Sequence, residues 1–211
     1  MLFADQALEE LLAGLPQEDR WRTPRASANP WPLLFVAREL CAQGRGEQAV
    51  PLLRQVAELP MAETRVRLWA WGALRGLGAR PEAGRAREVL GVVVELPLAL
   101  GVDTLAAYRD GTARYLNQGG SLSIQDGAEP AAVRRVERLL DLAEGLAGSM
   151  PLAARRPPPK ARVRFSLLTR VGILCSEEPL SRAGTEESFL CAVFKSAAAV
   201  MASVIRAERA D

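Results

Sequence analysis

The segment VDTLAAYRDGTARYLNQGGSLSIQDG, from Val102 to Gly127, decides the fold class of this chain. It divides into three short runs that end in Asp-Gly, Gly-Gly and Asp-Gly. Such pairs between runs of β-forming residues are the turn residues that hairpins favour. The segment therefore predicts a ladder of three antiparallel strands, at about 102–109, 112–118 and 121–125, rather than a reaction centre in one loop.

Two-residue turns would determine which side chains of this ladder share a face. Turns at Asp110-Gly111 and Gly119-Gly120 pair Tyr108 with Ala113 and Tyr115 with Ile124. The face predicted to pack against helices carries Ala106, Tyr108, Ala113, Tyr115, Leu122 and Ile124. The other face carries Arg109, Thr112, Arg114, Ser121, Ser123 and Gln125, with Leu105 and Leu116 as apolar exceptions. The tyrosines and arginines are thus predicted to lie on opposite faces.

Further strands and two helices flank this ladder. The β-branched run VLGVVVEL predicts a strand at 89–96, although its apolar character also permits a helix. RVRFSLL alternates polar and apolar residues and predicts a strand at 162–168, with a hairpin partner at 171–176. Amphipathic spacing predicts helices at 130–150 and 186–207, the second capped by Thr185. The expected architecture over 81–211 is a two-layer α+β domain, an antiparallel sheet with helices on one face.

The N-terminal part, residues 1–80, is predicted to be helical. Apolar spacing and turn residues place antiparallel helices at about 3–15, 31–43, 48–59 and 63–77. Asn29 is a suitable cap for the second of these, and Pro30 suits its first turn. In the fourth, Trp69 aligns with Val66 and is predicted to be core. Trp71 points to another side and is expected to pack against the second domain, a partner or another copy of the chain.

Two of these helices resemble one tetratricopeptide hairpin. The first-helix apolar positions of that repeat are matched by Leu33, Val36, Ala37 and Leu40, and the second-helix positions by Ala49, Leu53 and Val56, with Pro60 near the usual proline. The resemblance covers about 30–63 and implies a helical surface that binds peptides or proteins. If 89–96 were helical, the remaining order would be similar in topology to the type III secretion chaperone-like fold, whose members bind partner polypeptides.

Composition excludes several chemistries. The 211 residues contain no histidine, which removes Ser-His-Asp and Cys-His mechanisms and histidine-ligated zinc. Cys41, Cys175 and Cys191 are far apart and lie in apolar runs, so buried thiols are expected rather than a metal site. The acidic pairs Glu177-Glu178 and Glu186-Glu187 end a strand and cap a helix, so neither indicates catalysis. No cofactor motif is present, and an enzyme is less favoured than a binding protein.

Charge and hydropathy indicate the setting of the protein. A net charge of +2 is too small to imply nucleic acid or an anionic membrane. The run from Phe189 to Ile205 is short for a membrane span and predicts a buried helix. Only Lys160 and Lys195 among the 27 basic residues are lysine, which is typical of a GC-rich genome. These features indicate a cytoplasmic, bacterial protein.

The sequence therefore predicts a non-enzymatic adaptor, chaperone-like or regulatory subunit that binds another, acidic, protein. The candidate partner-binding residues are Arg109, Arg114, Arg162, Arg164 and Trp71. The four arginines are expected to lie on one solvated sheet face. The sequence is also compatible with a homo-oligomer. The alternative is an enzyme or small-ligand-binding protein with a pocket between its two parts, using neither histidine nor metal.

Overall fold

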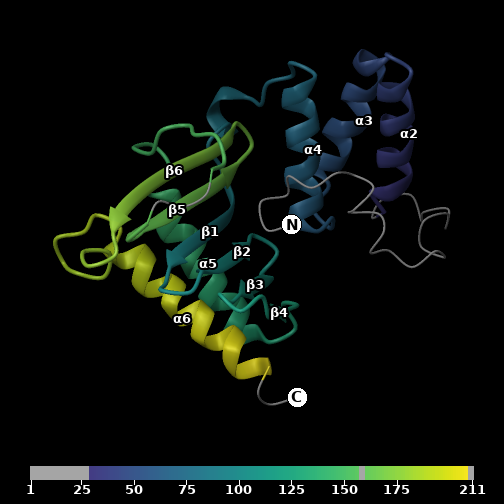
Figure 1. Ribbon diagram of the computed structural model, residues 1–211. Helices are drawn as coiled ribbons and strands as arrows, with labels where there is room; N and C mark the ends of the chain where they lie inside the picture. The colour runs from purple at the N-terminus through teal and green to yellow at the C-terminus, as the bar shows by residue number, and fades with distance from the viewer. Residues whose placement is uncertain (1–28, 157–159, 209–211) are drawn as a thin grey trace. The chain divides into compact units, whose positions relative to one another are not determined.

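The computed structural model describes residues 29–156 and 160–208 of the chain (Figure 1). The helix expected at 3–15 lies outside these residues. The chain forms two compact units, of which the first ends at Ala86 and the second begins at Arg87.

The first unit is helical, as predicted. Its α-helices are α2 (Trp31–Ala42), α3 (Gly46–Glu58) and α4 (Thr64–Gly76), followed by the 3₁₀ turn η1 (Ala83–Arg85). Each α-helix packs against the next one along the chain. The side chain of Asn29 accepts a hydrogen bond from the backbone N–H of Trp31 at 3.1 Å, so it satisfies one of the open donors at the start of α2.

Two details of the helical unit differ from the expectations. Leu34 and Ala37 are the buried residues of α2, whereas Val36 is 52% exposed and Cys41 is also exposed. In α4, Trp71 is 2% exposed while Trp69 is only half-buried. In α2 the buried stripe is displaced by about one residue, or about 100° around the helix, whereas in α4 Val66 is buried as predicted and only the two tryptophans exchange roles.

The second unit is a six-stranded antiparallel sheet with two helices, which confirms the α+β class. The strands are β1 (Val89–Pro97), β2 (Val102–Tyr108), β3 (Ala113–Leu116), β4 (Leu122–Gln125), β5 (Arg162–Thr169) and β6 (Gly172–Pro179). Their order across the sheet is β4-β3-β2-β1-β5-β6. The run at 89–97 is a strand and lies at the centre of the sheet.

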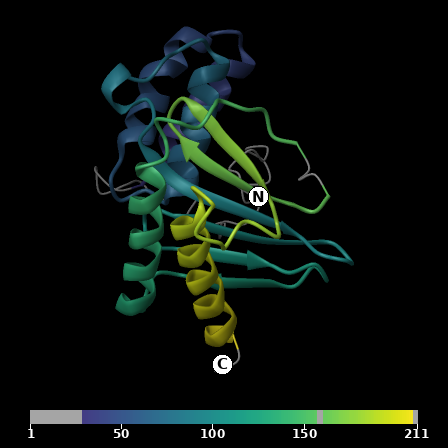
Figure 2. The ribbon, with the colours of Figure 1, turned by 90° about the vertical axis from the view of Figure 1, so that its left-hand side faces the viewer.

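Both helices of this unit lie on one face of the sheet (Figure 2). They are α5 (Pro130–Glu144) and α6 (Cys191–Glu208). α5 packs on β1 and β2, α6 packs on β3 and β4, and the two helices pack on each other. The main core lies between the sheet and these helices, where Phe165 and Phe194 meet edge to face with their ring centroids 6.2 Å apart.

The strand register is shifted by one residue from the prediction. Ala106 pairs with Arg114 and Leu105 with Tyr115. The connection is a three-residue loop, Arg109 to Gly111, in which the N–H of Tyr108 donates to the carbonyl of Thr112 and Gly111 has a φ of +82°. The next connection, Gln118 to Gly120, repeats this pattern with Gly120 at +88°. Three-residue loops with a glycine in the left-handed region are a common alternative to two-residue turns.

This shift redistributes side chains between the two faces. Tyr115 faces α5 and α6 as part of the main core, but Tyr108 lies on the opposite face. Ser123 and Gln125, which were predicted to be solvated, face the helices and are 6% and 7% exposed. The prediction that both tyrosines share one face was wrong, because a one-residue slip turns every side chain of a strand to the other side.

The last helix begins later than predicted, at Cys191. Thr185 lies in a turn, where its hydroxyl donates to the carbonyl of Arg182 at 2.9 Å, so it does not cap α6. Only one side of α6 is buried, through Val193, Ala197, Val200 and Val204. None of the helices in the described residues is long and apolar enough to cross a membrane.

Candidate functional site

A row of charged side chains crosses the sheet face that lies away from the helices. The register places Glu177 of β6 opposite Arg164 of β5, Arg164 opposite Glu95 of β1, and Glu95 opposite Thr104 of β2. Arg164 is 3% exposed and Glu95 is 8% exposed. Buried charges are costly unless they are paired, so the contacts within this row decide what it does.

Arg164 is fully engaged within its own unit. Its Nε donates to Oε1 of Glu177 at 2.9 Å, and its Nη2 donates to the same oxygen. Its Nη1 donates to the backbone carbonyl of Arg156. Arg156 also donates to Oε1 of Glu177, at 3.0 Å. Arg164 therefore joins β5, β6 and the segment that precedes β5, and it is not available to an acidic partner.

The two glutamates of the row have opposite pKa shifts. Burial raises the pKa of Glu95, although Arg164 and Arg155 oppose this effect. The Oε2 atom of Glu95 is buried and has no hydrogen-bond partner. Burial alone would also raise the pKa of Glu177, but hydrogen bonds from Arg164 and Arg156 outweigh it and lower that pKa.

Opposed pKa shifts in neighbouring carboxyl groups are a feature of acid–base sites. In this row, however, Arg164 lies between the two groups and bonds to Glu177. Cys175 lies on the same face beside Ser166, and burial raises the pKa of its thiol, so it is not an activated nucleophile. The row is best explained as a clamp between strands.

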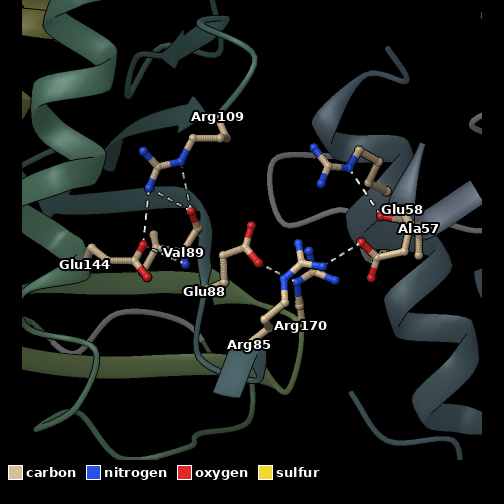
Figure 3. A network of polar contacts seen from close by, with 9 residues as sticks. Ala57, Glu58, Arg85, Glu88, Val89, Arg109, Glu144 and Arg170 are labelled. Atoms are coloured by element: carbon tan, nitrogen blue, oxygen red, sulfur yellow. Dashed lines mark hydrogen bonds and ion pairs between the residues drawn. The ribbon is translucent and has the colours of Figure 1, made fainter. Parts of the chain in front are cut away.

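Arg109 lies in the β2–β3 loop and turns toward α5 (Figure 3). Its Nε and Nη2 donate to the carbonyl of Val89 at 3.2 and 3.1 Å, and its Nη2 also donates to Glu144 at 3.2 Å. Its Nη1 donates to Asp141 at 2.9 Å. Glu144 in turn accepts from the backbone N–H of Val89 at 2.9 Å. The arginine expected on a solvated sheet face instead ties the sheet to α5.

Of the other candidate residues, Arg114 and Arg162 are half-buried on the same sheet face as Arg164, as predicted, and Trp71 is buried. Arg162 donates to the carbonyl of Glu177 at 2.8 Å. Arg114 lies on the face away from the helices, as predicted, in register with Ala106 and Ile124. Trp71 is buried, so it does not offer an exposed aromatic ring to a partner. Three of the four predicted arginines therefore share one sheet face, while Arg109 is bound to α5 and Trp71 belongs to the first unit.

A different surface feature does combine apolar and charged groups. A groove of about 810 Å³ runs along the outer side of α5 and α6. The helices are antiparallel (Figure 2), with Arg135 near the start of α5 donating to Ser203 near the end of α6 at 3.4 Å. The groove is lined by Arg135, Arg138, Leu142, Glu186, Ser188, Phe189, Cys191, Ala192, Lys195, Ser196 and Ala199.

The walls of this α5–α6 groove have regular helical spacing. Arg135, Arg138 and Leu142 follow one stripe of α5, while Ala192, Ser196 and Ala199 follow one stripe of α6. At one end stands Phe189, whose side chain is 58% exposed. An exposed phenylalanine beside a largely apolar depression is a feature of binding surfaces.

Cations border this apolar surface. Arg138 and Lys195 are exposed and make no hydrogen bond or ion pair with any residue in the described part of the chain. The apolar run from Phe189 to Ile205 predicted a buried helix, but only one side of α6 is buried and the other side is exposed. The sequence signals for the groove were Arg135 and Arg138, three residues apart on α5, and Lys195 on α6.

The described residues contain no group of three or more His, Cys, Asp or Glu side chains that could hold a metal ion. The chain matches no family model, and searches of curated proteins and of solved structures found no significant match.

Proposed function

We propose that this chain is a non-enzymatic protein-binding subunit, of an adaptor, chaperone-like or regulatory kind, that engages its partner through the α5–α6 groove. The observation that carries the proposal is the exposed Phe189 beside an apolar depression bordered by Arg138 and Lys195. Interfaces are enriched in aromatic and arginine side chains that become buried on association. The proposed class of function is the one predicted from the sequence. The proposed binding surface differs from the prediction, because it lies on α5 and α6 rather than on the sheet.

Two other features support the proposal and its setting. The resemblance of 30–63 to a tetratricopeptide hairpin also implies a protein-binding role; α3 buries the matching positions Ala49, Leu53 and Val56, whereas Val36 of α2 is exposed. Cys41, Cys175 and Cys191 are free thiols, and only Cys41 is exposed. Free thiols are typical of a reducing compartment, which favours a cytoplasmic setting. A bacterial origin rests on the arginine-rich, lysine-poor composition alone.

The test uses photo-crosslinking from the groove itself. A photoreactive phenylalanine analogue replaces Ser196, and the protein is irradiated in extract of the source organism. A specific partner should be crosslinked by the otherwise unchanged chain and lost when Phe189→Ala and Lys195→Glu are added. It should be retained when Arg134→Glu is added instead, because Arg134 is exposed on α5 but does not line the groove. An adduct that persists in the Phe189→Ala, Lys195→Glu protein would contradict the proposal.

A further inference from the structure

We infer that the occupant of the α5–α6 groove is an acidic amphipathic helix of another protein, which lies along α5 and α6 as a third helix. This inference rests on the proposed function and specifies its partner. It follows from three properties of the groove: the helical backbone of its walls, the small residues along its α6 wall, and the sign of the charges at its edge.

The walls favour a helix over an extended strand. The groove is bounded by two α-helices, whose interior backbone N–H and C=O groups are already bonded within each helix. A strand that binds by adding to a sheet needs an open edge with free backbone groups, and this surface offers none in the described residues. A helix satisfies its own backbone and needs only side-chain packing from the groove.

The α6 wall of the groove permits close approach of a partner helix. Ala192, Ser196 and Ala199 are small and are spaced by three or four residues along α6. Side chains of a partner helix with the same spacing can enter between such positions, as ridges enter grooves in packed helices. Leu142 and Phe189 provide larger apolar contacts for these side chains. The lining of α5 from Arg135 to Leu142 extends about two helical turns, long enough for apolar anchors at positions i, i+3, i+4 and i+7.

The charged residues around the groove favour a partner of negative charge. Arg135, Arg138 and Lys195 line the groove, against the single carboxylate of Glu186. Carboxylates on both sides of the apolar stripe of a partner helix would meet these cations. A second copy of this chain, docked through the same face in a symmetric dimer, would bring the cations against one another instead. Charge complementarity therefore indicates an acidic partner rather than self-association.

Synthetic peptides test this inference on the full chain. One helical peptide of about 18 residues carries leucines at i, i+3, i+4 and i+7 with glutamates beside them. A second has the same leucines with lysines, and a third has the acidic sequence interrupted by a central proline. Fluorescence anisotropy should show the acidic peptide binding at least about tenfold more tightly than either of the others, with affinity falling as salt is added.

Matched variants of the chain then locate the site. Ala192→Trp fills the groove without changing charge, and it should weaken binding of the acidic peptide by about tenfold or more. Ala198→Trp is the control, because Ala198 is exposed on α6 but does not line the groove. The double change Arg138→Glu and Lys195→Glu should reverse the preference in favour of the lysine peptide. Equal binding of the acidic and basic peptides, or equal effects of the two tryptophans, would overturn the inference.

Failure of the inference can be separated from failure of the proposed function. If no acidic peptide binds but the groove variants still lose a crosslinked partner, the partner is a protein of different character and only the inference is wrong. If the groove variants affect neither peptide binding nor crosslinking, both are wrong.

Discussion

Arg164 donates two hydrogen bonds to a single carboxylate oxygen of Glu177, across the pairing of β5 with β6. The arginine is 3% exposed, so its charge depends on this neighbour for compensation. β6 is an edge strand with α5 and α6 on the far side of the sheet, and this ion pair anchors it from the face that the helices do not cover.

Replacing Glu177 should therefore destabilise the second unit. Glu177→Gln leaves the buried guanidinium of Arg164 without its counter-charge, and we expect a loss of about 2–4 kcal/mol in the free energy of unfolding. Denaturation followed by circular dichroism measures this loss. Glu137→Gln, at an exposed position of α5, should change stability by less than about 0.5 kcal/mol. Equal effects of the two changes would mean that the ion pair contributes nothing.

Glu95 should destabilise the folded chain increasingly as the pH rises. Its pKa is raised in the folded chain, so its contribution to stability is present below the ordinary value of 4.5 and is lost as the pH rises through the folded-state pKa. Glu95→Gln removes the titration and keeps the shape. The variant should melt at a higher temperature than the unchanged chain at pH 7, and this advantage should disappear below pH 4.5. An advantage that is the same at both pH values would refute the assignment.

The Glu177 carboxylate provides the contrasting profile. Its pKa is lowered, so its contribution is present above the ordinary value of 4.5 and is lost as the pH falls through the lower folded-state value. The stability difference caused by Glu177→Gln should accordingly be largest near pH 7 and should shrink in acid.

The sequence was sufficient to predict the strands of the second unit but not their register. Alternation and turn residues are local signals, and they located every strand to within a few residues. Asp110-Gly111 suits both a two-residue turn and a three-residue loop that ends in a left-handed glycine. The choice between them depends on packing with residues far along the chain. The single-residue difference moved Tyr108, Ser123 and Gln125 to the opposite faces from those predicted.

The candidate sites were harder still to predict. The clamp needs β5, β6 and β1 in register, and the groove needs two helices that are distant in sequence to lie side by side. Arg109 illustrates the limit, since its partners Asp141 and Glu144 belong to a helix that begins well after the hairpin. The local sequence shows only that Arg109 stands next to a turn. It does not show which carboxylates the arginine will bind.

The two loop glycines provide a matched test of the observed register. Gly111 and Gly120 have nearly the same φ, +82° and +88°. A Cβ on Gly111 would lie 3.0 Å from both γ-methyl groups of Val133, whereas a Cβ on Gly120 would meet nothing within 4 Å. Gly120→Ala should cost about 1 kcal/mol, from backbone conformation alone. Gly111→Ala should cost at least about 1 kcal/mol more, because α5 must shift. Chemical denaturation of the two variants compares them, and equal costs would refute this contact with Val133.

Arg109 should be a structural residue rather than a binding residue. Arg109→Ala removes hydrogen bonds to the Val89 carbonyl and to two carboxylates of α5, and we expect a loss of about 1–2 kcal/mol. Arg109→Lys keeps the charge but not the fork of donors, so it should recover only part of this loss. Peptide binding in the α5–α6 groove should be unchanged in both variants. Full stability in Arg109→Ala, together with weaker peptide binding, would restore the role that the sequence suggested.

Tyr115 should titrate well above an ordinary tyrosine. Its hydroxyl donates to Oδ2 of Asp103 at 2.6 Å, and burial together with this carboxylate raises the pKa of Tyr115 to about 12. In a Tyr108→Phe protein, Tyr115 is the only tyrosine of the chain, so its ionisation can be followed by ultraviolet absorbance. Circular dichroism recorded on the same samples confirms that the chain is still folded. Adding Asp103→Asn should lower the pKa of Tyr115 while leaving it above 10.0, because burial remains. A midpoint near 10.0 before that change would show that Tyr115 is neither buried nor hydrogen-bonded to Asp103, and an unchanged midpoint after Asp103→Asn would show that the hydrogen bond between β2 and β3 is not formed.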